Sequence, residues 1–465
     1  MKKFSLLLST FLFLLSSCAP AATTAPSPII TREAAGADAT ATFAAPGPTS
    51  ATEPSVDVVA SLRGAVITVW HPWFGVEASL FESQVAEFNS TNQWGITVLS
   101  ISQNNYAELF SSVSSSLAAP GKPTLVIGLP EHALFWNSQS GVADWTPYVT
   151  DPQWGWAANE QADFSSAFWT QDVADGKRIG LPAQRTARFL FYNRGWARQL
   201  GFESAPHTPD EFRAQACAAN QAMRKNADMN DDRTGGWLVD ADPLTPLSWM
   251  QAFDGGALEA GNYRFLTPNN IEAFKFTKQL FDENCAWQSS GPATPFEEFA
   301  NRRALFVAGN LEDMSALTRA LNTIGNADEW VALPFPGLSQ EAFFVYGSSY
   351  ILLPSSDVEQ LAAWLFVRQM LSPENQARWV ETTGMFPLRT STLTLVADYA
   401  STHPQWVAAV RLLPKASLPP QRADWRTVRV ALGDGFDFMF RTNVPIGQVA
   451  AILAQMDAVT RDVAK

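Results

Sequence analysis

The chain has 465 residues, of which 46% are hydrophobic, so it can bury a large core and form more than one folded unit. Its formal net charge is −13 and it has no run of clustered lysine and arginine, which excludes nucleic acid as an expected partner. No apolar stretch reaches the roughly 20 residues of a membrane-spanning helix, so we expect a soluble protein apart from its N-terminus.

The N-terminus has the layout of an export signal. A positive segment, MKK (1–3), is followed by an apolar run of signal-peptide length at 4–15. The next letters, LSSC (15–18), resemble a bacterial lipobox, in which the cysteine is lipidated and becomes the new N-terminus. We therefore predict a lipoprotein signal peptide at 1–17 and a lipid anchor at Cys18. The alternative is an ordinary secretory signal that happens to contain a cysteine.

Residues 18–62 are rich in alanine, threonine, proline and serine and contain few large apolar side chains. Such a tract cannot bury enough surface to offset its ordering entropy, so we predict a disordered tether. Its prolines favour extended conformations, which suit a spacer between a membrane and the folded part at 63–465. The predicted location is the outer face of the cell membrane, on the extracellular or periplasmic side.

The folded part begins with alternating strand and helix patterns. Near-continuous apolar runs predict buried strands at 65–70, 95–102 and 123–130. Apolar residues at helical spacing predict one helix that ends near residue 90 and another at 106–119. This order indicates an α/β unit with a mostly parallel sheet, in which ligands bind at the loops after the strands.

The second half repeats the same mixture of elements without an internal sequence repeat. Thr208 has the features of a helix N-cap, because proline and two acidic residues follow it, and the helix should run to about residue 225. The remaining predicted elements are a strand at 188–192, a helix at 269–284, strands at 302–310, 330–337 and 343–354, and helices beyond 357.

Two cysteines remain besides Cys18. An exported protein meets oxidants, and an even number of cysteines favours pairing. Cys217 lies in a predicted helix and Cys285 follows another, so a disulfide between them would join two helices of one lobe. Two separate buried thiols are the alternative.

The segment DMNDDRTGG (228–236) raises the question of calcium. Asp228, Asn230 and Asp232 alternate as calcium-loop ligands do, but Arg233 stands where such a loop needs glycine and Val239 where it needs glutamate. We favour a polar surface loop, with a weak calcium site as the alternative, and predict no other metal or cofactor.

Sequence motifs of common enzymes are absent. The chain has no G-x-S-x-G, H-E-x-x-H or G-x-x-x-x-G-K-[ST] pattern. A glycosidase pair of carboxylates has no fixed sequence spacing and so cannot be judged from these letters. The sequence favours a binding protein over an enzyme.

Several stretches, in order, resemble the extracellular solute-binding proteins of carbohydrate ABC importers, the family that includes maltose-binding protein. The most specific are YNRGWARQLGF…TPDEF and LSPENQARWVETTGMFPLR, within a resemblance that covers roughly 65–460. It implies a two-lobe periplasmic-binding-protein fold of type II, in which each lobe is a mostly parallel sheet flanked by helices and the C-terminal region is helical. By analogy, lobe 1 is about 63–184 and 329–356, and lobe 2 about 188–328 and 357–465.

The resemblance also implies a mechanism and partners. A small solute, most simply a sugar, would be captured as the two lobes close on it, and permease subunits would recognise the closed form. A monomer is expected. A sensor or adhesion protein that reuses the fold is the alternative.

Sugars need aromatic platforms and hydrogen-bonding groups, so we expect ligand contacts in the loops after strands and at the crossings between lobes. By analogy, residues 128–132, 245–249 and 309–312 fall on cleft-facing loops. The predicted contacts are Trp70, His71, Trp73, Glu131, His132, Arg185, Thr186, Trp249, Asn310, Tyr346, Ser348, Met385 and Phe386. Core packing is the alternative for Trp70, and an ordinary surface position for His71.

The first predicted crossing departs from the maltose-binding pattern. Where that protein carries a carboxylate, this chain reads Gln184-Arg185-Thr186, with Arg188 two residues further on. On a strand, Thr186 and Arg188 would share one face and Arg185 the other. An arginine in the cleft suits a carboxylate or phosphate, so a glycerol phosphate ester or a uronate is an alternative to a neutral sugar. A surface ion pair is the other interpretation.

Overall fold

The structure, a computed structural model, describes residues 60–463. Cys18, the predicted signal peptide at 1–17 and nearly all of the predicted tether lie outside these residues. The tether prediction is wrong at its end, because Leu62 is fully buried in the same core as the first strand. Within the described part, no helix has both the length and the apolar character to span a bilayer.

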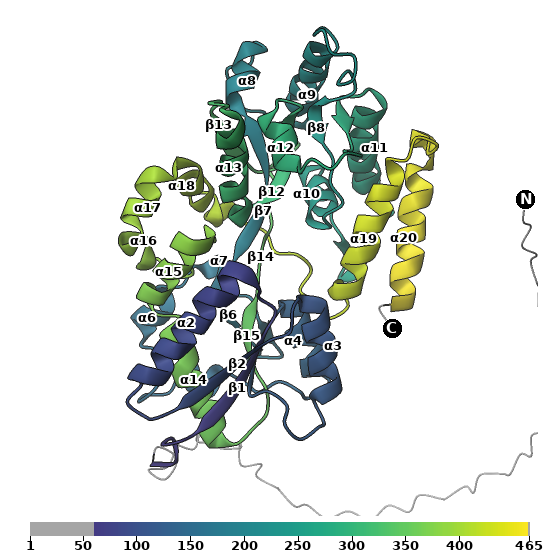
Figure 1. Cartoon of the computed structure of the whole chain (residues 1–465). Helices are drawn as coiled ribbons and strands as arrows, with labels where there is room; N and C mark the ends of the chain where they lie inside the picture. Colours follow the sequence, from purple (N-terminus) through teal and green to yellow (C-terminus); the bar gives the residue numbers. More distant parts are fainter. Residues whose placement is uncertain (1–59, 464–465) are drawn as a thin grey trace, which may run out of the picture. The chain divides into compact units, whose positions relative to one another are not determined.

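Two sheets form the centres of two lobes (Figure 1). The first has five strands, in the order β2 (Thr97–Ser102), β1 (Val66–His71), β3 (Leu125–Gly128), β15 (Ser349–Leu352) and β6 (Leu181–Pro182). The second has the order β11 (Ala286–Trp287), β8 (Gly235–Leu238), β12 (Ala304–Asn310), β7 (Thr186–Asn193) and β13 (Trp330–Leu333), with β14 (Val345–Tyr346) paired to the start of β7.

Both sheets are mixed, so the prediction of mostly parallel sheets is wrong. In the first sheet β1 pairs parallel with β2 and β3, whereas β15 pairs antiparallel with β3 and β6. In the second, β8 pairs parallel with β11 and β12, whereas β7 pairs antiparallel with β12 and β13. The reversal has a simple cause: the two segments that cross between the lobes run in opposite directions.

Those crossing segments are paired with each other. Val345 and Tyr346 of β14 lie opposite Ala187 and Thr186 of β7. The predicted position of the second crossing, near 327–330, is wrong, because β13 is still part of the second sheet. The chain enters the first lobe only at β15. A short apolar strand looks the same in either lobe, so the letters of β13 could not reveal its partner.

The helices are distributed as follows. Those of the first lobe include α2 (Gly75–Thr91), α3 (Tyr106–Ser116), α4 (Pro130–Ser138), α14 (Asp357–Met370) and α15 (Pro373–Thr383). Those of the second include α9 (Pro209–Met223), α10 (Leu244–Ala252), α11 (Pro268–Asp282), α12 (Pro295–Ala300), α13 (Met314–Ile324), α19 (Trp425–Met439) and α20 (Val449–Val463). Shorter elements include α8 (Arg194–Gln199), α16 (Thr392–Leu395), α17 (Ala397–Thr402) and α18 (Pro404–Val410).

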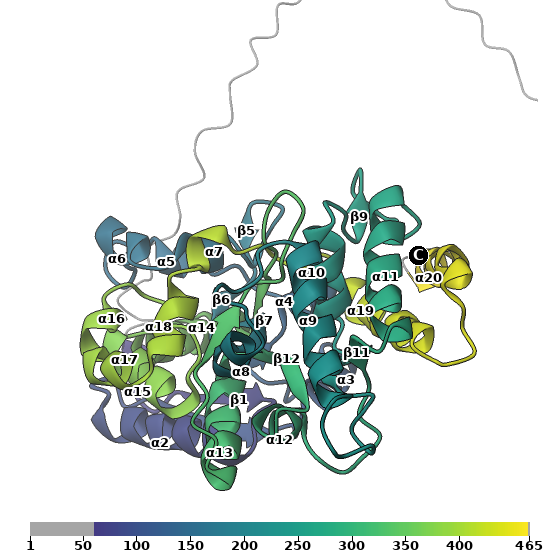
Figure 2. The ribbon, with the colours of Figure 1, turned by 90° about the horizontal axis from the view of Figure 1, so that it is seen from above.

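The C-terminal helices are divided between the lobes. The predicted placement of 357–465 wholly in lobe 2 is wrong, because α14 packs on β1 and β15 and α15 packs on α2. By contrast, α19 and α20 lie beside α10 and α11 of the second lobe (Figures 1 and 2). Helix α14 buries side chains on most of its surface. A helix that is apolar nearly all round could cover the sheet of either lobe, so its sequence does not indicate the lobe to which it belongs.

Strand β7 shows how the core is built. All of its side chains are buried, as expected of a strand covered on both faces. Phe189 and Phe191 belong to the core that continues from the first lobe, whereas Leu190 and Tyr192 belong to the second-lobe core. Alternate residues of a strand point to opposite faces, so β7 packs into two cores at once.

Two local predictions are confirmed in the second lobe. The Thr208 side chain accepts a hydrogen bond from the backbone N–H of Glu211 and caps α9, which begins at Pro209. The Cys217–Cys285 disulfide is also present and joins α9 to the segment before β11.

Candidate ligand-binding site

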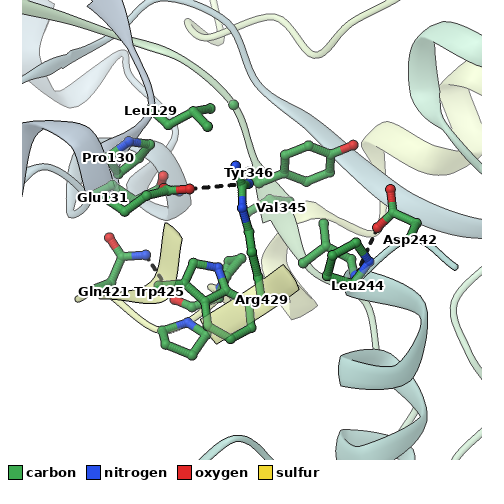
Figure 3. Close-up of a pocket in the computed structure, with 15 residues that line it drawn as sticks. Leu129, Pro130, Glu131, Asp242, Leu244, Val345, Tyr346, Gln421, Trp425 and Arg429 are labelled. Carbon is green, nitrogen blue, oxygen red and sulfur yellow. Dashed lines mark hydrogen bonds and ion pairs between the residues drawn. The ribbon is translucent and has the colours of Figure 1, made fainter. Parts of the chain in front are cut away.

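A cavity lies where loops after strands of both sheets meet, beside β14 (Figure 3). The first lobe contributes residues 129–131, at the start of α4. The second contributes residues 242–244, which lead into α10, and the start of α19. Tyr346 lies on the crossing strand at its edge. The cavity measures about 140 Å³, below the roughly 300–1,000 Å³ of usual ligand pockets. A sugar-sized solute therefore requires its walls to move apart.

An ion pair crosses this cavity from one lobe to the other. Arg429 Nη1 of α19 lies 3.2 Å from Glu131 Oε1 of α4 (Figure 3). Glu131 is only 7% exposed; burial raises its pKa, and the positive charge of Arg429 opposes that rise. One turn earlier in α19, the Arg426 guanidinium stacks 4.1 Å from the Phe110 ring of α3. These two contacts hold the lobes together in this conformation.

Arg185 lies outside the cavity, so its predicted ligand contact is not supported. Its side chain is fully buried and pairs with Asp172 at 2.9 Å, also fully buried. It donates further hydrogen bonds to the Ser349 hydroxyl and to the Ser348 carbonyl, on the returning crossing segment. Burial lowers the pKa of Arg185, and the negative charge of Asp172 opposes that change. Arg185 thus ties the two crossing segments together.

Arg188 faces the second lobe. Its Nη2 lies 2.6 Å from Asp240 Oδ1 and its Nη1 3.9 Å from Asp242 Oδ2, while Nη1 also donates to Asn310 at 3.2 Å. Burial alone would lower the pKa of Arg188, but the charges of Asp240 and Asp242 outweigh it and raise that pKa. Two carboxylates therefore already neutralise this arginine.

The predicted split of faces along β7 is confirmed. Thr186 donates its hydroxyl hydrogen to Glu312 of the second lobe, on the same side as Arg188. Arg185 turns to Asp172 on the other side. The alternation along the strand follows from its pleat.

Most of the predicted apolar contacts are core residues instead. Trp249 is fully buried in the second-lobe core, and Trp73 is 3% exposed and donates its indole N–H to Gln184 at 2.9 Å. Met385 and Phe386 are also buried, and Phe386 belongs to the core of the first lobe. In this conformation none of the four lines the cavity. Aromatic rings near strand ends fill the core as readily as they line a cleft, which explains the difference.

The two predicted histidines are buried and neutral. Burial lowers the pKa of His71 to about 4 and that of His132 to about 3. Among residues 60–463, neither ring nitrogen of His71 has a hydrogen-bond partner, whereas His132 Nδ1 accepts from the Leu129 N–H. Trp70 is half-buried and packs against a smaller core cluster of the first lobe that includes Leu109 and Trp136. Of the predicted contacts, Glu131 and Tyr346 line the cavity, and the fully buried Ser348 adjoins it through Gly347.

Several cavity residues were missed by sequence reasoning. Trp425, Arg429, Gln421 and Asp242 all line it. Trp425 and Arg429 are four residues apart in the stretch ADWRTVR, so a helix brings them to one face. That spacing of an aromatic and a cation was the available signal.

The segment at 228–236 uses its polar groups internally. Asp228 accepts hydrogen bonds from the backbone and side-chain nitrogens of Asn230, at 3.0 and 2.8 Å. The group of potential metal ligands that the described residues bring within reach of one ion is a different one, Cys217, Glu283 and Cys285, and both of its sulfurs are in the disulfide. The geometry agrees with a polar surface loop.

Several solved structures share this fold. The sugar-binding protein MalE from Xanthomonas citri superposes with a TM-score of 0.72 at 19% identity, covering 86% of this chain and 98% of that one. UgpB from Mycobacterium tuberculosis, solved in complex with glycerophosphocholine, superposes with a TM-score of 0.71 at 15% identity, covering 86% of this chain and 98% of that one. The cyclic alpha-maltosyl-1,6-maltose binding protein from Arthrobacter globiformis superposes with a TM-score of 0.67 at 20% identity, covering 86% of this chain and 99% of that one. The predicted two-lobe binding-protein fold is confirmed.

Sequence comparison places the chain more narrowly. The model of the family described as "Bacterial extracellular solute-binding protein" matches residues 83–409, and the chain belongs to this family. A binding protein of Brucella abortus strain 2308 is 23% identical over 290 residues, which are 60% of this chain and 67% of that protein. The predicted family is confirmed, and membership implies export to the periplasm or the cell surface.

Proposed function

We propose that this protein is a receptor anchored through lipidated Cys18, which captures a carbohydrate between its lobes and delivers it to the permease of an ABC importer. It acts as a monomer and releases its ligand chemically unchanged. Two acyl chains suffice for stable anchoring, and the segment up to the first strand is long enough to let the receptor reach both solute and permease.

One observation carries the proposal: the cavity is lined from both lobes, at loops that follow β3 and β8. A solute held there touches both lobes only when they are closed, so its binding energy shifts the population towards the closed form. The ion pair between Glu131 and Arg429 spans the same space and would open to admit a solute. Tyr346 and Trp425 supply aromatic surface beside it.

An anionic solute has less support. Its recognition was expected from Arg185 or Arg188, but Arg185 is paired with Asp172, and Arg188 with Asp240 and Asp242. An anion would have to displace an intramolecular carboxylate in either case.

A thermal-shift screen of the full chain against neutral mono- and oligosaccharides, followed by calorimetry, tests the ligand class. A bound sugar should raise the unfolding temperature in proportion to the logarithm of its concentration. A screen in which no sugar stabilises the protein would overturn the carbohydrate assignment. The anchor has a separate test: the wild-type chain should fractionate with membranes and the Cys18→Ser variant should not.

A further inference from the structure

A second cavity lies across the crossing strands from the one beside β14. Its walls come from α13 and the first residue of β13, in the second lobe, and from the end of α15, α17 and α18. In both overall views α18 lies on one side of β7, whereas α19, which lines the first cavity, lies on the other (Figures 1 and 2). Among the described residues none lines both cavities, so they are distinct sites.

This second cavity is large enough to admit a small solute as it stands. It measures about 260 Å³, against about 140 Å³ for the cavity beside β14, and comes close to the roughly 300–1,000 Å³ of usual ligand pockets. Several of its lining side chains, among them Ser315 and Thr318 of α13, are exposed, so the cavity is reached from solvent.

Aromatic rings form its apolar wall. The rings of Tyr399 and His403 are stacked, with their centroids 3.9 Å apart and their planes 10° from parallel. Trp406 meets Tyr399 edge-on, at 5.4 Å between ring centroids, and Trp330 of β13 adds a second buried indole. A sugar ring has an apolar C–H face, and a flat aromatic surface of this kind suits it.

Hydrogen bonds and close packing hold this wall in place. The Trp406 indole N–H donates to the Met385 carbonyl at 3.4 Å, and His403 Nδ1 lies 2.8 Å from the Tyr399 carbonyl oxygen. Gly384, at the end of α15, has a φ of 76°, and a Cβ there would lie 3.2 Å from the Tyr399 hydroxyl oxygen. Glycine therefore lets α15 end directly against this ring. A wall that is fixed before binding loses less entropy when the ligand arrives.

Hydrogen-bonding groups of both kinds stand on different walls of the cavity. Arg319 of α13 and Glu381 of α15 both line it and are exposed. Arg319 donates to the Ser315 hydroxyl at 3.3 Å, and within residues 60–463 neither Arg319 nor Glu381 forms an ion pair. A guanidinium offers only donors and a carboxylate only acceptors, whereas a sugar hydroxyl can do both. Because the two charges are opposite, an anionic or a cationic solute would meet a like charge, and a neutral sugar fits best.

We propose that this cavity is a second carbohydrate site, in which a small neutral sugar packs on the aromatic wall and bonds to Arg319 and Glu381. The inference goes beyond the proposed function, because it adds a separate site with its own lining residues. The receptor then holds two sugars per chain, one on each side of the crossing strands. The second sugar also contacts both lobes, since α13 belongs to the second and α15 packs on α2 of the first.

The test is titration calorimetry on the full chain with glucose, maltose and trehalose, and with glucuronate and glucosamine as charged analogues. We expect two molecules of at least one of the neutral sugars to bind per wild-type chain. Arg319→Ala and His403→Ala should each weaken one of the two binding events at least tenfold. Arg411→Ala is the matched control, because Arg411 is exposed just after α18 and lines neither cavity.

A bulky side chain gives a second, independent measurement. Ser315→Trp fills the cavity from α13 and should reduce the stoichiometry from two to one. Thr323→Trp adds the same ring at an exposed position of α13 outside the cavity and should leave the stoichiometry at two.

The outcomes separate this site from the first. If one sugar molecule binds per chain and neither Ser315→Trp nor Arg319→Ala changes its affinity, the second site is overturned and the proposed function stands. If the single binding event is lost in Ser315→Trp, this site is supported and the cavity beside β14 is overturned as the place of capture. Tighter binding of glucuronate or glucosamine than of glucose at this site would overturn the assignment to a neutral sugar. If none of the neutral sugars binds, both proposals fall.

Discussion

The buried ion pair between Arg185 and Asp172 allows a sharp prediction of stability. Both side chains are fully buried, and Arg185 also bonds the returning segment at Ser348 and Ser349. The Arg185→Met change keeps an unbranched side chain in place but leaves Asp172 charged and unpaired. Removing one partner of a buried pair costs about 3–5 kcal/mol, so we expect the free energy of unfolding to fall by that amount.

Urea unfolding, followed by tryptophan fluorescence, measures this change. Adding Asp172→Asn to Arg185→Met removes the unpaired negative charge of residue 172 and should recover part of the lost free energy of unfolding. Arg224→Met is the control, because Arg224 is exposed at the end of α9 and its change should stay within about 0.5 kcal/mol. A loss below about 1 kcal/mol in Arg185→Met, or a double variant no more stable than the single one, would refute the role given to this pair.

Three further predictions concern the disulfide, the pH dependence and the interlobe contact. Replacing Cys217 and Cys285 by serine opens a bridge that spans 68 residues, and a lower urea midpoint should report a loss of about 4 kcal/mol. The pKa of Glu312 rises from 4.5 to about 7 on folding. The protonated carboxyl therefore stabilises the folded state fully below pH 4.5, and this contribution to the free energy of unfolding is lost as pH rises through 7. Glu312→Gln should flatten the stability profile over that range, and parallel profiles would contradict this. Arg429→Met removes the ion pair to Glu131, so small-angle scattering should show a larger radius of gyration; an unchanged radius would mean that the pair does not hold the lobes.

The fold was predictable because its signals are local. The apolar runs marked β1, β2 and β3, and the N-cap at Thr208 placed the start of α9. Partnership between distant segments was not predictable in the same way. Whether β13 joins the first or the second sheet depends on where the chain crosses, and its four residues carry no mark of that.

The site was less predictable for a related reason. Trp249 and Trp425 are both nearly inaccessible aromatics of the second-lobe core, yet only Trp425 also lines the cavity. Arg185 and Arg188 are three residues apart on one crossing, and their distant partners, Asp172 and Asp240, decide what each can do. Sequence gives the type of side chain, but folding decides which groups are already neutralised.

The central claim is that one solute is held by both lobes at once. Hydrogen–deuterium exchange of the full chain, with and without a saturating sugar found in the screen, tests this directly. We predict that peptides from the start of α4, in the first lobe, and from the start of α19, in the second, gain protection together. Protection confined to one lobe, at a sugar concentration where calorimetry shows saturation, would contradict the account.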